Sequence, residues 1–422
     1  MTARDHDLVL FGATGFVGQL TAKHLVDNTP AGTRVALAGR NRDKLEKVRA
    51  DLGAAAADWP VLVLDASDAD AVADLARSTT VVVTTVGPYA KYGMPLLAAC
   101  AEAGTHYCDL TGEVLFVRDA IDEHHARAVE TGAKIVPSCG FDSIPSDLGV
   151  LVLAEAVREA GAGELGGTLN HVRSLRGGVS GGTIDSMRQQ TIVSGEDKAL
   201  RRIAGDPYGL SPDRGEEPPS RNRPTEPPAN ILEKVARQSP ARLDPVTGRW
   251  VAPFFMASYN TRIVRRSNAL TNWSYGRTFR YDEVMDTGKG VGGAVKAGLT
   301  TAVLGGLFGG MSFGPTRSVL DRVLPKPGEG PSEESQAKGR FVMEIVTTTT
   351  TGADFRTTVA ADYDPGYSGT AIMLGQAALA LALDTDRLPA GGGILTPATA
   401  LGDVLVDRLR EHGFTFETRQ AS

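Results

Sequence analysis

The sequence predicts an α/β fold, in which a doubly wound parallel sheet is joined to an inserted α+β domain with a mixed or antiparallel sheet. Three observations support this prediction. Short apolar strands alternate with amphipathic helices up to about residue 147, a glycine-rich turn follows the first strand, and the alternation stops near residue 165. We therefore expect a first domain over 1–147, an α+β domain over 148–365, and C-terminal helices over 366–422 that pack back on the first domain.

Length and composition exclude several classes of protein. The chain has 422 residues, enough for two domains with sizeable cores, and its 42% hydrophobic and 22% charged residues are typical of a soluble globular protein. A net charge of −6 gives no general attraction to nucleic acid. The three cysteines form no Cys-x-x-Cys pair and no long apolar segment opens the chain. We expect no metal, no nucleic-acid partner and a reducing, cytoplasmic location.

The first strand, turn and helix predict a phosphate-binding site. Residues 8–11 form an apolar run of strand length, and a helical pattern begins near Val17. Gly12 permits the turn, Gly15 lets a pyrophosphate approach the backbone, and Gly18 lets the helix pack closely on the strand. Free N–H groups at the helix start favour an anion. A Rossmann-type dinucleotide site is therefore expected at Gly12, Ala13, Thr14, Gly15, Phe16 and Val17. The alternative is a tight turn that binds no ligand.

The next two strands predict which dinucleotide binds. The strand over 34–38 leads into Arg40, where NAD-binding units carry an acidic residue for the ribose hydroxyls. A cation favours the 2′-phosphate, so NADP(H) is the expected cofactor. The alternative is a solvated charge that opens a helix over 43–52. A third buried strand, 61–65, places Asp65 near the adenine, although Asp65 equally suits the N-cap of a helix over 68–77.

Two later turns complete the predicted site. The strand over 81–86 ends in Val86, Gly87 and Pro88, which we expect to border the nicotinamide because ligands lie beyond the carboxyl ends of parallel strands. Ordinary turn chemistry is the alternative for this loop. Helices over 94–103 and 114–131 and a strand over 134–137 lead to a polar run over 138–147. This run also lies beyond the carboxyl end of a strand, and we expect it at the site. The alternative is a turn in which Ser146 is the N-cap of a helix over 147–159.

The pattern of predicted strands and helices is less regular in the second half of the chain. We expect a strand over 169–175, a helix over 184–204, a hairpin of 340–350 with 355–361, and helices over 368–383 and 397–409. Residues 206–245 hold nine prolines and predict an irregular surface excursion. The basic run 261–267 favours a strand edge, with an acidic partner or a phosphopantetheine arm as alternatives.

The segment 297–314 has no charged residue and six glycines. It is too glycine-rich for a confident membrane span. A buried helix or an oligomer interface, such as that of a homodimer, is the first interpretation. Peripheral contact with the inner face of the membrane is the second.

Familiar catalytic motifs are absent from the sequence. A glycine turn of this kind also occurs in short-chain dehydrogenases, whose catalytic tyrosine precedes a lysine by four residues. No tyrosine here does so, and Tyr89, for example, is followed by Gly93 at that distance. His-Glu-x-x-His, Gly-x-Ser-x-Gly and phosphate-loop sequences are also missing. These absences argue against the corresponding mechanisms. The sequence is therefore expected to encode a reductase that has none of these catalytic motifs.

Several motifs carry a resemblance to a known family. The stretches 11–18, 38–40, 85–89, 107–113 and 139–147 resemble the saccharopine dehydrogenase-like oxidoreductases, and most of all the mycobacterial trans-acting enoyl reductases. The resemblance implies a cofactor between two domains and NADPH-dependent reduction of an α,β-unsaturated acyl thioester in polyketide or complex lipid biosynthesis. It also implies a lipid-like substrate and a polyketide synthase or acyl carrier as partner.

Placement at strand ends suggests the catalytic residues. Tyr89 is the first candidate for proton donor, and Asp142 and Ser143 come next. Two other functions stay open: a reductase of a carbonyl or imine substrate, and a non-catalytic protein that senses NADP.

Overall fold

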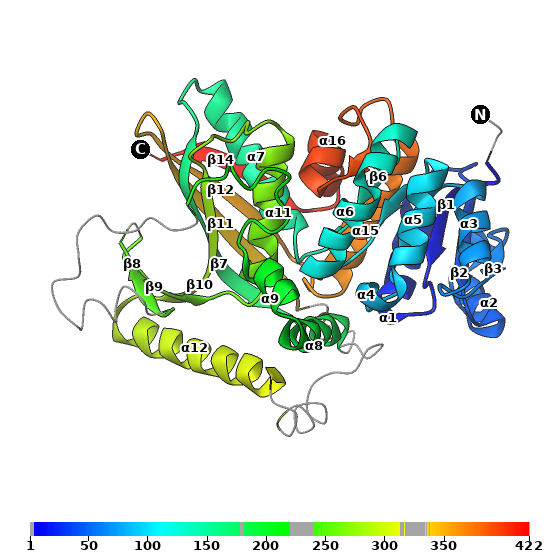
Figure 1. The fold of residues 1–422 in the computed structure, drawn as a ribbon, viewed down its shortest axis with the longest axis horizontal. Helices are drawn as coiled ribbons and strands as arrows, with labels where there is room; N and C mark the ends of the chain where they lie inside the picture. Colours follow the sequence, from blue (N-terminus) through cyan, green and yellow to red (C-terminus); the bar gives the residue numbers. More distant parts are fainter. Residues whose placement is uncertain are drawn as a thin grey trace.

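The computed structural model describes residues 4–177, 181–219, 240–245, 247–312, 316, 334, 336 and 338–421. It confirms the predicted fold class, with one parallel sheet and one mixed sheet side by side (Figure 1). Sheet A has the strand order β13-β6-β5-β4-β1-β2-β3, and sheet B has the order β14-β12-β11-β7-β10-β9-β8.

Sheet A is parallel throughout, as the alternation of strands and helices predicts. Its strands are β1 (His6–Phe11), β2 (Val35–Gly39), β3 (Val61–Val63), β4 (Thr79–Thr84), β5 (His106–Cys108), β6 (Lys134–Val136) and β13 (Gly393–Ile394). All five residues of β2 are buried, because helices cover both faces of the sheet. The expectation of a buried third strand was wrong, since β3 is an edge strand and Val63 is 44% exposed.

Helices of the first half follow the predicted order, with two corrected caps. They are α1 (Phe16–Asn28), α2 (Arg42–Asp51), the 3-10 turn η1 (Ala54–Ala56), α3 (Ala69–Ser78), α4 (Tyr89–Tyr92), α5 (Met94–Ala103), α6 (Val114–Thr131) and α7 (Ile144–Glu159). Asp68, and not Asp65, caps α3 by accepting a 3.1 Å hydrogen bond from Ala71 N–H. Ser146 does not cap α7, which begins earlier; its buried hydroxyl donates to Glu283 Oε1 at 2.6 Å.

Sheet B contains the predicted hairpin. Its strands are β7 (Leu165–Arg176), β8 (Arg242–Asp244), β9 (Arg249–Pro253), β10 (Arg280–Gly288), β11 (Arg340–Thr349), β12 (Asp354–Ala361) and β14 (Thr415–Gln420). β7 and β10 run parallel and the other neighbours antiparallel. Its helices are α8 (Gly181–Glu196), α9 (Lys198–Gly205), α11 (Ala257–Leu270) and α12 (Gly290–Ser312). The helix expected over 184–204 is therefore two helices, interrupted where Asp197 caps α9.

The basic run 261–267 is a buried helix and not a strand edge. It lies in α11, and Arg262, Arg265 and Arg266 are at most 6% exposed. Their guanidinium groups donate to backbone carbonyls; Arg266, for example, bonds Leu210 O and Ile394 O, each at 2.7 Å. Three buried cations thus hold surrounding backbone in place, and none is exposed to meet an acidic partner.

Two other expectations need correction. The proline-rich segment is not wholly on the surface, because Tyr208 and Leu210 are buried; its residues 220–239 lie outside the described part. Most of the described part of 297–314 is exposed on α12, so the interpretation as a buried helix was wrong.

The C-terminal segment returns to both sheets. Helix α15 (Ser368–Leu383) packs on α1 and on sheet A, and α16 (Pro397–Glu411) packs on α7 and α15. Besides these expected helices, the segment supplies β13 to sheet A and β14 to sheet B.

Candidate active site

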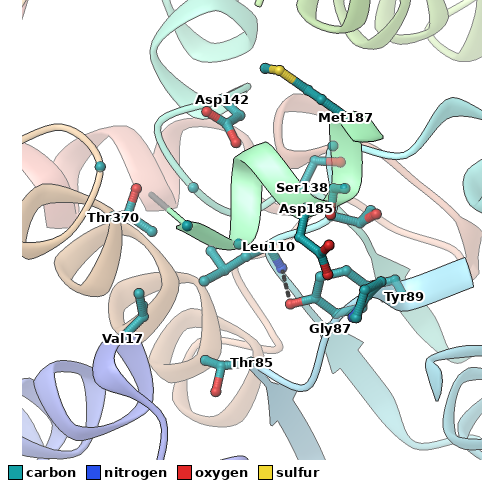
Figure 2. A pocket seen from close by; sticks show the side chains of 18 of the residues that line it. Val17, Thr85, Gly87, Tyr89, Leu110, Ser138, Asp142, Asp185, Met187 and Thr370 are labelled. Carbon is teal, nitrogen blue, oxygen red and sulfur yellow. Dashed lines mark hydrogen bonds between the residues drawn. The ribbon is translucent and has the colours of Figure 1, made fainter. Parts of the chain in front are cut away.

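A cavity of about 260 Å³ lies beyond the carboxyl ends of the strands of sheet A (Figure 2). Its walls come from the start of α1, from the loops after β4, β5 and β6, and from α8, α11 and the approach to α15. Ligands of doubly wound sheets bind at this position, so the cavity is the candidate site.

The glycine turn has the predicted shape. Gly15, Phe16 and Val17 line the cavity, whereas Ala13 is buried beneath them. Gly12 has φ +95°, and a Cβ on Gly18 would lie 2.2 Å from the Gly12 carbonyl oxygen, so both positions require glycine. No side chain caps the start of α1. Its first N–H groups therefore remain available for a phosphate, which fits a dinucleotide.

The other residues predicted to bind the cofactor divide into two groups. Gly87 and Pro88 line the cavity, and Val86 lies just before them with its N–H donated to Thr84 Oγ1 at 3.2 Å. Arg40 and Asp65 lie away from the cavity, beyond the ends of the adjacent strands β2 and β3. Hydrogen bonds from the Ser67 backbone and hydroxyl, with the nearby charge of Arg40, lower the pKa of Asp65.

Tyr89 lies in the cavity wall, but its hydroxyl bonds the backbone. It donates to Thr84 O and accepts from Leu110 N–H, both at 3.2 Å, the latter drawn in Figure 2. Burial raises its pKa well above the usual range. The phenol therefore braces the loops after β4 and β5, and its role as proton donor stays a prediction.

Asp142 has the environment of an acid. It lines the cavity, and burial raises the pKa of its carboxyl to about 7. No hydrogen bond to it is found among the described residues. A carboxyl in this setting keeps its proton near neutral pH and can give it to a bound molecule. Ser143, the third candidate, is fully buried at the start of α7 and does not line the cavity.

Sequence reasoning missed a hydroxyl pair in the cavity wall. Ser138 and Tyr259 both line the cavity, and their hydroxyl oxygens lie 2.5 Å apart. Ser138 has φ +70°, an uncommon value for a residue other than glycine, and its N–H donates to Asp109 Oδ1 at 2.9 Å. Tyr259 lies on α11, 121 residues further along the chain, and no local motif connects the two positions.

Helix α8 closes one side of the cavity. Ser186 donates to the Glu113 carboxylate at 2.8 Å, and that carboxylate accepts from Tyr89 N and Ala90 N at 2.9 and 2.8 Å. The same carboxylate therefore ties α8 to the loop after β4.

The cavity combines an apolar wall with two acids. Met187, Phe255, Met256 and Phe308 supply apolar surface, and the charged side chains that line it are Asp142 and Asp185. Within the described part of the chain, no lysine or arginine lines it. In the described part of the chain no three His, Cys, Asp or Glu side chains are grouped as metal ligands would be.

Comparison with known proteins first defines the class. Residues 8–136 match the family model of the saccharopine dehydrogenase NADP-binding domain. The structure resembles saccharopine dehydrogenase (L-Glu forming) from Saccharomyces cerevisiae, with a TM-score of 0.53 at 12% identity over 98% of this chain and 99% of that one. The fold and the glycine turn thus define an NADP-dependent oxidoreductase with the saccharopine dehydrogenase architecture.

Full-length relatives then define the family. A putative trans-acting enoyl reductase of Mycobacterium tuberculosis is 48% identical over 99% of this chain and 98% of its own length. A trans-acting enoyl reductase of Mycobacterium bovis is 46% identical over 99% of both chains, and one of Mycobacterium leprae is 45% identical over the same shares. This chain belongs to the trans-acting enoyl reductase family. The predicted resemblance and cofactor, NADP(H), are confirmed.

Proposed function

We propose that this protein reduces the carbon–carbon double bond of an α,β-unsaturated acyl thioester. The names of its relatives support an enoyl substrate. The observation that carries the proposal is the position of Asp142, whose carboxyl lines the same cavity as the glycine turn. Burial raises the pKa of this carboxyl to about 7.

The residues of the turn fit the cofactor. The first N–H groups of α1 would hold the pyrophosphate, Arg40 the 2′-phosphate, and Gly87 and Pro88 would border the nicotinamide. When bound, NADPH supplies a hydride to the β-carbon of the substrate.

The side chains of the cavity supply the rest of the reaction. Asp142 gives its proton to the α-carbon, so a hydride and a proton add across the double bond, and the carboxylate then recovers a proton from water. Negative charge develops on the thioester oxygen during the addition. The hydroxyls of Ser138 and Tyr259 are the donors we assign to that oxygen.

The charges of the cavity favour an acyl substrate over an amino acid. Because no lysine or arginine of the described residues lines the cavity, a substrate carboxylate would lack a counter-ion among them. The apolar wall of Met187, Phe255 and Met256 suits an acyl chain. Two acids also suit a cationic imine, so a carbonyl or imine reductase is the second candidate. A protein that only senses NADP is the third.

The partner we propose is an acyl carrier, either free or part of a polyketide synthase, because the relatives are named as acting in trans. A cytoplasmic location and a homodimer are part of the same proposal.

Turnover of a substrate panel separates these candidates. Purified protein is mixed with NADPH and with enoyl thioesters of coenzyme A and of acyl carrier protein, with carbonyl and imine compounds for comparison. We expect NADPH absorbance to fall with enoyl thioesters only. Turnover of imines alone would contradict the proposal in favour of the second candidate, and tight binding without turnover would indicate a sensor.

Replacing Asp142 by asparagine tests the acid. We expect kcat to fall about 100-fold with little change in the Kd of NADPH. Wild-type kcat should decrease as the pH rises through about 7, since the protonated carboxyl is the active form, and Asp142→Asn should lose this dependence. Rates measured across a pH series check both points.

Glu155→Gln is the matched control, because the pKa of Glu155 is also raised to about 7 but Glu155 lies outside the cavity. It should keep the wild-type profile. Folding raises the pKa of Asp142, so its ionisation lowers stability as the pH rises from about 4 to about 7. Asp142→Asn should therefore melt higher than wild type at pH 8, and no higher at pH 4. If Asp142→Asn melts at a lower temperature than wild type at both pH 4 and pH 8, Asp142 has a structural role instead.

A further inference from the structure

We propose that the exposed face of α12 binds a lipid bilayer and lies flat in its interface. The α12 stripe is the set of large apolar side chains on this face, each at least 60% exposed: Val291, Val295, Leu299 and Val303. Spacings of four residues place them along one side of the helix. At 1.5 Å per residue the stripe is about 18 Å long.

The composition of α12 suits a lipid environment better than a protein core. Among the described helices, only Gly290–Met311 is long and apolar enough to cross a membrane by length and composition, with a mean hydropathy of 1.4. Only 11% of its most apolar window is buried within the molecule. A contiguous exposed apolar surface of this kind marks an interaction site.

The opposite face of the helix is fixed to sheet B. Gly293 and Ala297 are buried there, and a Cβ on Gly293 would lie 3.3 Å from Trp250 Cβ. The Thr287 hydroxyl donates to Gly293 O at 3.0 Å. Because crossing a bilayer would break these contacts, we assign α12 to the interface, parallel to the membrane plane.

Charge and polarity favour lipid over a second copy of the chain. From Ala297 onward α12 has no charged residue, and it carries no acid at all. The exposed Lys289 and Lys296 lie at its N-terminal end, where they can meet lipid phosphates. A protein interface pairs its apolar centre with hydrogen bonds. The side chains of the α12 stripe offer no hydrogen-bonding group.

Helix α12 also reaches the candidate active site. Phe308, in the C-terminal half of α12 and on another side of the helix than the stripe, lines the cavity. Figure 1 shows α12, in yellow, along one edge of the molecule, with α8 beside its C-terminal half. A bound bilayer would therefore lie next to the cavity. Delivery of lipid-like substrate by this route rests on the proposed function, whereas the binding itself does not.

Vesicle flotation of the full-length protein, without substrate or cofactor, tests the proposal. The probes are vesicles of phosphatidylcholine alone and of phosphatidylcholine with phosphatidylglycerol. We expect wild type to float with both, because burial of the apolar stripe drives binding. Leu299→Glu and Val303→Glu should each bind about tenfold more weakly.

Val129→Glu is the matched control, since Val129 is 52% exposed on α6, away from α12. It should float like wild type. Absence of flotation by wild type, or equal flotation of all variants, would overturn the proposal. So would a dimer, seen by sedimentation velocity, that Leu299→Glu dissociates while no vesicle is bound.

The enoyl reductase assay is independent of this result. NADPH oxidation by Leu299→Glu with a short, soluble enoyl thioester should equal that of wild type. Flotation without any turnover would reject the proposed function and leave the lipid contact standing.

Discussion

Two carboxyls with raised pKa values, Asp109 and Asp142, show how surroundings decide a role at the scale of one residue. Asp109 accepts from Tyr107 Oη at 2.7 Å and from the N–H groups of Thr111 and Ser138, each at 2.9 Å. Burial still raises its pKa to about 6. Asp142 has no such donors among the described residues and its pKa rises to about 7. We therefore assign a structural role to Asp109 and a role in proton transfer to Asp142.

Arg40→Asp should change the preferred cofactor. The substitution removes the cation proposed for the 2′-phosphate and supplies an acceptor for a ribose hydroxyl. We expect the Kd of NADPH to rise at least about tenfold and the affinity for NADH to improve. Titration of both cofactors by calorimetry measures the change.

The neighbouring Arg42→Asp is the control for Arg40→Asp. Arg42 is the first residue of α2 and its side chain is 62% exposed. Arg42→Asp makes the same change in net charge as Arg40→Asp and should leave the preference for NADPH intact. Equal effects of the two substitutions would show that general charge, and not a contact at residue 40, sets the affinity.

At the scale of elements, α11 shows where local pattern fails. A short run of arginines and β-branched residues suits a strand as well as a helix. Arg266 in this run donates to the backbone carbonyls of Leu210 and Ile394, which lie 56 and 128 residues away along the chain. No local feature of the run reveals those partners, so tertiary contacts decided the element.

Gly18→Ala should disrupt the contact between β1 and α1. Its Cβ would lie 2.2 Å from the Gly12 carbonyl oxygen, so the turn must shift. We expect a loss of about 1–3 kcal/mol of unfolding free energy and weaker NADPH binding. Thermal melts with and without NADPH measure both effects.

Gly167→Ala is the control for that substitution. Gly167 is exposed on β7, with no atom within 4 Å of its would-be Cβ. This variant should melt and bind like wild type. An unchanged Gly18→Ala protein would refute the close approach seen at the turn.

For the whole molecule, the C-terminal segment connects the two halves. It supplies β13 to sheet A and β14 to sheet B, and the cavity is lined by residues from both halves. The sequence predicted the helices of this segment but neither short strand. A two-residue strand such as β13 carries no periodic pattern, and its pairing with β6 spans most of the chain.

We expect the two sheets to melt together. The three tryptophans report on both, because Trp59 packs in the core beside sheet A while Trp250 and Trp273 lie in the other half. Trp59→Phe and the double variant Trp250→Phe/Trp273→Phe should show the same fluorescence midpoint. Saturating NADPH should raise both midpoints equally. Separate midpoints would show that the halves unfold independently.

The sequence by itself determined the first strand, turn and helix, the NADP(H) cofactor and the family, because each rests on short motifs, and the residues within one motif lie a few positions apart. It also placed Asp142 at the site, since polar residues that follow a parallel strand meet at one edge of the sheet. Only the tertiary structure brought Tyr259 to Ser138, turned the Tyr89 hydroxyl to the backbone and left one face of α12 exposed. Those outcomes depend on contacts between distant parts of the chain, and local spacing carries no information about them.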